Sequence, residues 1–243
     1  MKNLQKEINW LLKEKYNNKS NLQFKEDIKR LDKGELLDYV IGFVEFLGCR
    51  IDLSKRPLIP RPETEFWIEQ ELKNINSGKV LDIFSGSGCV GVALLMNKPK
   101  LLCDFSDKQK DSISQIKINC KLNNINKKRY KIIQSDIFKN IKNKYDFIFA
   151  NPPYIATTRK NKIQKSVLKY EPKISLFGGE SGLKYINKFL KDAKKYLNID
   201  GKIFMEFDYI QKNQIEKLLK KYKYKNWKFN KDQYGKYRWV VIE

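Results

Sequence analysis

The sequence predicts an α/β protein whose mostly parallel sheet ends in an antiparallel hairpin, and three observations predict this fold. First, from residue 79 onward, apolar segments of strand length alternate with segments of helical periodicity, as in a parallel sheet covered on both faces. Second, the last two strand-like segments are separated only by a short turn around residues 232–235. Third, 243 residues suit one such domain with a small extension.

A short helical N-terminal extension is expected over residues 1–34. Within residues 1–16, apolar residues recur at helical spacing with charges between them. This pattern predicts an amphipathic helix and differs from a signal peptide, which has an unbroken apolar core. A second short helix follows and ends at Gly34. The longest apolar runs have only the length of a strand, so no transmembrane helix is expected.

A connecting segment over residues 35–77 separates this extension from the main domain, which we expect at residues 78–243. Apolar and polar residues alternate at 49–53, which predicts a short strand. Three prolines between residues 57 and 62 exclude regular structure until Glu63, where a helix is expected to begin.

Seven strands are expected in the main domain, five alternating with helices and two in the closing hairpin. They are expected at residues 79–84, 100–105, 130–134, 145–150, 202–207, 224–229 and 237–242. Helices are expected at 89–96, 108–122, 182–197 and 211–222, and a lysine-rich loop at 155–176.

The composition excludes several classes of enzyme. The chain has no histidine, so Ser-His-Asp and Cys-His hydrolases, histidine acid–base chemistry and His-ligated zinc are excluded. The net charge is +22, but only seven of the 50 basic residues are arginine, the residue that phosphate recognition favours. Abundant Lys and Asn suggest AT-rich coding, so the charge does not by itself require a nucleic-acid partner.

The four cysteines contain no CxxC pair, so we expect reduced thiols in a cytoplasmic protein and no metal site. They are Cys49, Cys89, Cys103 and Cys120.

A glycine turn after the first strand of the main domain predicts a nucleotide-like cofactor. Gly86, Gly88 and Gly91 match the dinucleotide fingerprint, which is weak evidence alone, and the first two let the backbone pass close under a ligand. Asp82, at the end of the strand, is positioned to receive an amino group rather than a pyrophosphate. An NAD-dependent oxidoreductase would use the same glycines.

Two further strand ends carry acids toward the same edge of the sheet. Asp104 is expected to close the second strand, where it can accept both hydroxyls of a ribose. Asp136 is expected to close the third strand, where it or Ile137 can meet an adenine. Asp82 or Asp104 alone is as readily a helix cap or turn residue. The ordered set is typical of methyltransferases that use S-adenosyl-L-methionine (AdoMet).

The tetrapeptide Asn151, Pro152, Pro153 and Tyr154 follows the fourth strand and predicts the catalytic and substrate-binding site. Proline fixes φ and forces the preceding residue into an extended conformation. The Asn151 side-chain oxygen and the Pro152 carbonyl can accept two N–H bonds from one planar NH₂ group, on which Tyr154 can stack. Two acceptors hold a poorly nucleophilic amide or exocyclic amine in line with a methyl group and stabilise the developing positive charge.

From about residue 36 to its C-terminus the chain resembles the release-factor glutamine N5-methyltransferases, which are Rossmann-like class I AdoMet-dependent enzymes. The resemblance rests on residues 36–46, 58–65, 80–88, 151–155, Glu171-Pro172, Gly178-Gly179, Gly182-Leu183, Glu206 with Gln211, and Asp232 with Gly235 and Arg238. It implies methyl transfer to the glutamine of a Gly-Gly-Gln loop in peptide chain release factors, with S-adenosyl-L-homocysteine as the other product.

The resemblance also implies roles for individual residues. Those expected at the cofactor are Phe84, Ser85, Gly86, Ser87, Gly88, Asp104, Asp136, Ile137 and Asn151. Arg61, Glu63 and Thr64 are expected in a lid over its methionine end, and we expect a monomer.

The chain departs from the family pattern at three places. Phe84 stands where a small residue is usual, and Asp208 replaces a glycine after Glu206. Only about 35 residues precede the matching region, where the family usually carries a larger helical domain that helps to dock the release factor.

Two other methyl acceptors remain open. An adenine-N6 or guanine-N2 nucleic-acid methyltransferase would use the same acceptor geometry, although no room for a target-recognition domain follows residue 155. A glutamine of a ribosomal protein is the second. The basic residues of the segment 155–173 could touch an acidic substrate surface or simply be solvated.

Overall fold

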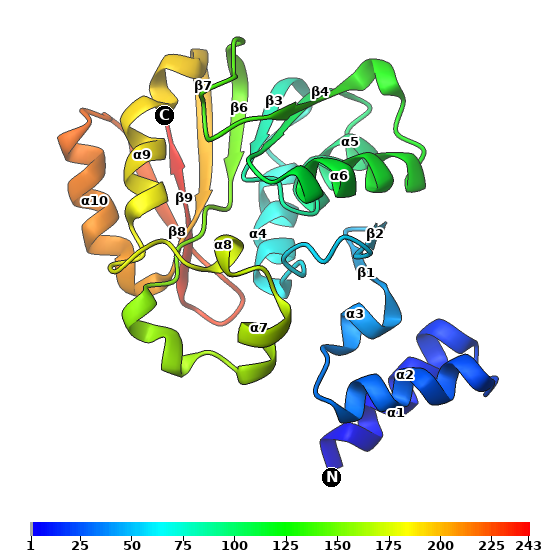
Figure 1. The fold of residues 1–243 in the computed structure, drawn as a ribbon. Helices are drawn as coiled ribbons and strands as arrows, with labels where there is room; N and C mark the ends of the chain where they lie inside the picture. Colours follow the sequence, from blue (N-terminus) through cyan, green and yellow to red (C-terminus); the bar gives the residue numbers. More distant parts are fainter. Residues whose placement is uncertain (1) are drawn as a thin grey trace.

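A seven-stranded sheet forms the centre of the molecule, as the sequence predicts, in a computed structural model that describes residues 2–243 (Figure 1). The strand order is β5-β4-β3-β6-β7-β9-β8; the first five of these are parallel, and β9 and β8 add an antiparallel edge. The strands are β3 (Ser77–Ile83), β4 (Lys100–Asp107), β5 (Tyr130–Gln134), β6 (Tyr145–Ala150), β7 (Leu197–Glu206), β8 (Trp227–Lys231) and β9 (Tyr237–Ile242).

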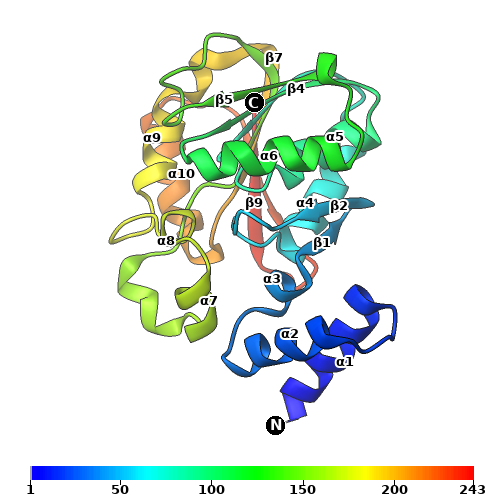
Figure 2. The same ribbon diagram turned by 45° about the vertical axis from the view of Figure 1, so that its right-hand side comes forward.

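Helices cover both faces of the sheet (Figures 1 and 2). Side chains alternate along β3, so Val80 packs with one hydrophobic cluster and Leu81 with the other. The first cluster joins the sheet to α4 (Pro62–Leu72), α5 (Cys89–Asn97) and α6 (Lys110–Leu122), and the second joins it to α9 (Lys184–Asp192) and α10 (Lys212–Lys221). In the first cluster, Trp67 of α4 stacks on Phe149 and Trp239, which fixes α4 against β6 and β9.

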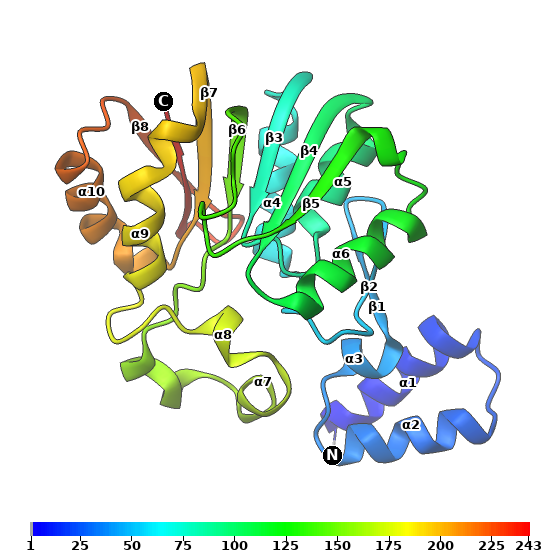
Figure 3. The same ribbon diagram turned by 45° about the horizontal axis from the view of Figure 1, so that its top comes forward.

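The N-terminal helices pack around a small core of their own. They are α1 (Lys2–Tyr16), α2 (Leu22–Asp32) and α3 (Leu37–Ile41), joined by a cluster that includes Leu11, Phe24 and Leu31. The buried Asp27 carboxylate accepts from Lys15 and Arg30, which neutralises its charge. These helices lie at the same end of the molecule as α7 (Lys165–Tyr170) and α8 (Lys173–Leu176) (Figure 3).

Hydrogen bonds to three side-chain amides hold the connecting segment against the main domain. The hairpin of β1 (Phe43–Phe46) and β2 (Cys49–Asp52) has an open edge. Backbone N–H groups of residues 50, 52 and 55 donate along it to the side-chain oxygens of Asn123, Asn119 and Gln115, at 3.1, 2.8 and 2.8 Å. Gln115 and Asn119 lie one turn apart on α6 and Asn123 directly follows the helix, so the three side chains point to the same side. These hydrogen bonds fix the start of the segment that follows the hairpin against α6.

Several predicted boundaries differ from the structure. The segment 155–176 is not a plain loop, because it contains η2 (Thr157–Lys162), α7 (Lys165–Tyr170) and α8 (Lys173–Leu176). Further short 3₁₀ turns are η1 (Lys127–Arg129), η3 (Ala193–Tyr196) and η4 (Tyr209–Gln211). The first hairpin strand begins at Trp227 rather than at 224, since Tyr224 is buried and its hydroxyl donates to the Leu190 carbonyl oxygen. None of the helices described between residues 2 and 243 is long and apolar enough to cross a membrane.

Candidate active site

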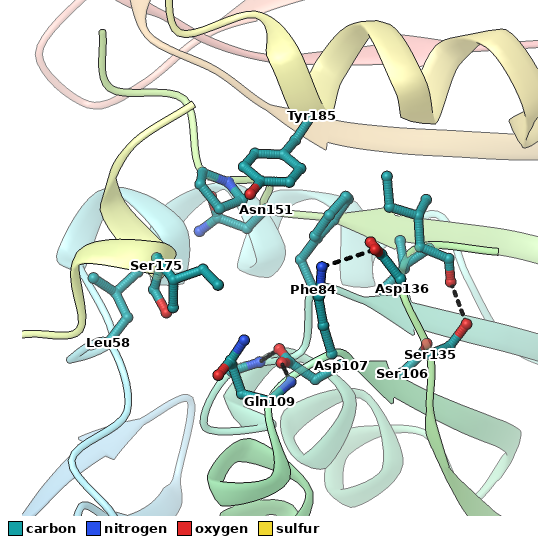
Figure 4. A pocket seen from close by; sticks show the side chains of 16 residues that line it. Leu58, Phe84, Ser106, Asp107, Gln109, Ser135, Asp136, Asn151, Ser175 and Tyr185 are labelled. Atoms are coloured by element: carbon teal, nitrogen blue, oxygen red, sulfur yellow. Dashed lines mark hydrogen bonds and ion pairs between the residues drawn. The ribbon is translucent and has the colours of Figure 1, made fainter. Parts of the chain in front are cut away.

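Two adjoining cavities lie at the carboxyl ends of β3, β4, β5 and β6, where ligands bind in open α/β sheets. Both are bordered by Leu58, Phe84, Gly86 and Asn151, so they form one cleft. The wider part continues to Asp107, Gln109, Ser135, Asp136, Ile137, Pro153 and Tyr185, and the narrower part to Arg61, Thr64, Asp82, Ser85 and Ser87. In Figure 4, Phe84 lies in the middle, with Asn151 and Tyr185 on one side and Asp107 and Gln109 on the other.

The glycine turn forms the floor of this cleft. Gly86 adopts φ +54°, and a Cβ added there would meet only the Phe84 carbonyl oxygen at 4.0 Å, so a ligand can approach the backbone closely. Gly88, also at positive φ, instead packs against Ile116. Gly91 serves helix packing, since a Cβ there would lie 2.2 Å from the Phe105 ring. Of the three fingerprint glycines, Gly86 is therefore the one that lines the cleft.

Phe84 enters the same turn with φ +61°, a conformation unusual for a residue with a side chain. Its ring packs edge-on against Tyr185 and Phe189, with ring centroids 6.4 and 6.1 Å away. These contacts with α9 offset the backbone strain, which costs about 1–2 kcal/mol. The departure from a small residue therefore gives the cleft an aromatic wall while the turn is kept.

The prediction that Asp104 closes the second strand is wrong. Strand β4 continues to Asp107, so Asp104 lies within the sheet, where its carboxylate accepts from the Tyr145 hydroxyl at 2.8 Å and from Asn143 Nδ2 at 3.1 Å. Lys79 Nζ lies 3.4 Å from the same carboxylate. Asp104 thus stabilises the fold, away from the residues that border the cleft.

Asp107 takes the position expected for Asp104. It ends β4 and borders the cleft, and its two oxygens accept from the backbone N–H groups of Gln109 and Gly86 at 2.8 and 2.9 Å. Each oxygen keeps a lone pair that can accept from a ribose hydroxyl. Burial raises the pKa of this carboxyl, and the backbone donors favour its charged form. The sequence offered one signal for this role, namely that a second acid, Asp107, follows Asp104 by three residues.

Asp136 and Ile137 border the far side of the wider cavity, after β5 ends at Gln134. Asp136 pairs with Lys108 Nζ at 2.8 Å, and both side chains are exposed at the rim. Ile137 adopts φ +55° in a turn held by the Ser135 hydroxyl, which donates to the Ile137 carbonyl oxygen at 2.9 Å. The turn places the apolar side chain of Ile137 against the cavity, where it could contact an adenine ring.

The cleft has the donors, acceptors and walls that AdoMet requires. Ser106 borders the wider cavity, and its hydroxyl is buried without a hydrogen-bond partner among residues 2–243. An unpaired buried hydroxyl is costly, and a bound polar ligand would satisfy it. Asp107 supplies acceptors for a ribose, and Phe84 and Ile137 supply apolar surfaces for a base. In the narrower cavity, the buried Asp82 accepts the Gly91 N–H at 3.0 Å, and burial raises its pKa to about 7.

The acceptor loop follows β6 directly and borders the junction of the two cavities. Asn151 lines both cavities and Pro153 lines the wider one, whereas Pro152 is buried. The Tyr154 hydroxyl donates to Glu206 Oε1 at 3.0 Å, and its backbone carbonyl accepts from Gln211 Nε2 at 2.9 Å. The loop is thus fixed from below by side chains at the end of β7 and at η4.

Two glycines let a second segment lie against this loop. A Cβ at Gly178 would lie 2.4 Å from the Pro153 carbonyl oxygen, and one at Gly182 would lie 2.2 Å from the Tyr154 carbonyl oxygen. The Gly178 N–H donates to the Ile155 carbonyl oxygen at 2.9 Å. The glycine pattern around residue 180 is therefore explained by close backbone approach to the acceptor loop.

The three predicted lid residues separate in the structure. Arg61 and Thr64 border the narrower cavity, whereas Glu63 borders neither part of the cleft. Arg61 precedes α4 and donates to the buried carboxylate of Glu171 at 2.6 Å, which ties the lid segment to the segment after α7.

Asp208, the other departure from the family pattern, has a structural role. Its side chain accepts from the backbone of Gln211 in a capping box that begins η4, and it also pairs with Arg159 of η2. This pair engages one of the basic residues of the segment 155–173 inside the protein.

The fold, the cleft at the strand ends and the Asn-Pro-Pro-Tyr loop define a class I AdoMet-dependent methyltransferase. Residues 63–179 match the family model of the methyltransferase small domain. A methyltransferase from Pyrococcus furiosus has the same fold, with a TM-score of 0.59 at 21% identity over 80% of this chain and 88% of that one.

Within this class, the chain belongs to the family of release factor glutamine methyltransferases. The Streptococcus pneumoniae family member is 36% identical over 91% of this chain and 80% of its own length. The Lactococcus lactis member is 32% identical over 97% of this chain and 88% of its own length. The chain is accordingly an enzyme that uses AdoMet to methylate protein glutamine, and the resemblance found in the sequence is confirmed.

Proposed function

We propose that this cleft transfers a methyl group from AdoMet to the side-chain amide nitrogen, N5, of the glutamine in the Gly-Gly-Gln motif of peptide chain release factors. The observation that carries the proposal is the position of Asn151, which borders both parts of the cleft. Asp107, Phe84 and Ile137 would hold the adenosine of the cofactor in the wider part. The narrower part, with Asp82, would take its methionine end.

The acceptor loop would do the chemistry by orientation. AdoMet, when bound, supplies an electrophilic methyl group, which forms a new N–C bond as its S–C bond breaks and S-adenosyl-L-homocysteine is left. The Asn151 side-chain oxygen and the Pro152 carbonyl would accept the two N–H bonds of the glutamine amide and stabilise the positive charge on its nitrogen. The methylated nitrogen is acidic enough to lose its proton to water, so the reaction needs no histidine.

The partner would be a release factor that places its glutamine loop at the mouth of the cleft, and the enzyme would act as a cytoplasmic monomer. The family names of the relatives support this substrate. The segment 155–173 is basic: its Arg159 pairs with Asp208 and its Glu171 with Arg61, which leaves Lys160, Lys162, Lys165, Lys169 and Lys173. Such a surface would suit an acidic face of the substrate protein.

The test separates cofactor binding from methyl transfer. The protein is incubated with radiolabelled AdoMet and purified release factor, and Asn151→Ala is compared with the wild type. We expect the wild type to label the factor, and Asn151→Ala to lose turnover while it still binds AdoMet measurably in calorimetry. An unlabelled release factor, beside a known family member that labels it, would contradict the proposal.

A further inference from the structure

Glu206 lies beneath the acceptor loop with both carboxylate oxygens occupied. It ends β7, and its side chain is fully buried. Oε2 accepts from the Thr64 hydroxyl and from Trp67 Nε1, each at 2.7 Å, and Oε1 accepts from the Tyr154 hydroxyl at 3.0 Å. One carboxylate therefore joins α4 of the lid segment to the acceptor loop.

These contacts fix the direction of a proton on Thr64. Burial raises the pKa of the Glu206 carboxyl, but the Trp67 N–H can only donate and so identifies Oε2 as an acceptor; the single hydroxyl hydrogen of Thr64 points at the same oxygen. The lone pairs of Thr64 Oγ1 are left for another donor, and Asn151 Nδ2 lies 3.5 Å from this oxygen. This distance is long for a hydrogen bond, as is common at catalytic sites before substrate binds.

We propose that Glu206 and Thr64 are positioning residues that set the orientation of the Asn151 side-chain amide. Through Thr64, Glu206 draws the NH₂ group of Asn151 toward α4 and leaves Oδ1 as the acceptor that faces the substrate. The inference rests on the proposed function, since it assigns the role of Oδ1 to the binding of the glutamine amide.

The reaction requires this control because the two ends of an asparagine amide have nearly the same shape. Rotation of the amide by half a turn would present N–H donors to the glutamine NH₂ group, which is itself a donor. The rotated state would repel the nucleophile instead of holding it. Steric packing alone cannot choose between the two orientations, whereas a chain of hydrogen bonds that begins at a carboxylate can.

The same carboxylate also fixes Tyr154, at the other end of the acceptor loop. Its hydroxyl is held by Oε1 while its carbonyl accepts from Gln211. Glu206 thus fixes both ends of the tetrapeptide, one directly and one through Thr64.

The experiment compares substitutions that keep or remove the hydroxyl of Thr64. Thr64→Val keeps the shape and removes the hydroxyl, and Thr64→Ser keeps the hydroxyl. Ser77→Ala, which removes an exposed hydroxyl at the start of β3, away from the cleft, is the control. The values of kcat and KM for release factor are measured at saturating AdoMet, so that any change in cofactor affinity does not enter. Thermal unfolding reports whether each variant is folded.

We expect Thr64→Val to lower kcat about 10- to 100-fold with little change in KM, since docking of the substrate is kept while its amide is misoriented. Thr64→Ser should restore kcat to within about threefold of the wild type, because the serine hydroxyl can make the same two bonds. Ser77→Ala should behave as the wild type. A kcat of Thr64→Val within about threefold of the wild type, or a failure of serine to restore it, would overturn the inference.

A second variant tests the dependence on the carboxylate. Glu206→Leu removes the oxygen that accepts from Thr64, so the Thr64 hydrogen is free to point at Asn151. We expect it to lower kcat at least as much as Thr64→Val, and the double variant to lose no more than Glu206→Leu alone. If the losses of kcat in the two single variants multiply in the double variant, Glu206 and Thr64 act independently, which would contradict the inference. If the wild type itself fails to methylate release factor, the proposed function fails, which separates the two outcomes.

Discussion

Replacement of Asp107 by alanine should weaken AdoMet binding far more than replacement of Asp104. A carboxylate that accepts from two ribose hydroxyls makes two charge-assisted hydrogen bonds, each worth about 1.5–3 kcal/mol. The loss of about 3 kcal/mol corresponds to an affinity about 100-fold lower. Asp107→Ala also removes the acceptor of the Gly86 and Gln109 N–H groups, which are backbone donors near the surface of the cleft, so the variant should still fold.

Asp104→Ala is the matched control, because it removes an acid of the same strand that does not border the cleft. It leaves the buried Tyr145 hydroxyl without its acceptor and Lys79 without its partner, at a cost of about 2–3 kcal/mol. For a chain of this size the midpoint of thermal unfolding should fall by roughly 5–10 °C. Its AdoMet affinity should stay within about threefold of the wild type.

Isothermal titration calorimetry with AdoMet and thermal unfolding of the cofactor-free proteins measure the two effects separately. The assignment of the ribose site would be refuted if Asp104→Ala lost about 100-fold in affinity while Asp107→Ala bound AdoMet as the wild type does.

Three further predictions address the turn, the lid and the acceptor loop. Gly182→Ala places a Cβ against the Tyr154 carbonyl oxygen, so it should reduce methyl transfer more than AdoMet binding; equal loss of both in the two assays would contradict this. Arg61→Ala leaves the buried Glu171 without its cation, so the protein should unfold several degrees earlier, and an unchanged melting curve would argue against it. Burial raises the pKa of Asp82 to about 7 from an ordinary 3.8, so its favourable contribution to folding is complete below pH 4 and is lost as the pH rises through 7. Asp82→Asn should therefore gain stability over the wild type across that range, up to about 3–4 kcal/mol in urea unfolding, whereas a gain independent of pH would disprove the cause.

The sequence predicts the fold well because the periods of its strands and helices are carried by many residues at once. The alternation of Val80, Leu81 and Ile83 between the two faces of β3, for example, follows from strand geometry alone. The acceptor loop is also predictable, since proline fixes the backbone wherever it stands.

The choice between Asp104 and Asp107 could not be made from the sequence. It depends on where β4 ends, and strand ends are set by tertiary contacts such as the bond from the Gly86 N–H to Asp107. The role of Glu206 is equally hidden, because its partners Thr64, Trp67 and Tyr154 lie 142, 139 and 52 residues away along the chain. Only the fold brings these side chains to one buried carboxylate.

Mass spectrometry of the release factor locates the transferred methyl group and so tests whether a single glutamine accepts it. The factor is incubated with the enzyme and AdoMet, digested, and compared with a variant in which the glutamine of the Gly-Gly-Gln motif is replaced by asparagine. We predict a single methyl group on that glutamine and none on the variant. Methylation of another residue, or of DNA or RNA while release factor stays unmodified, would contradict it.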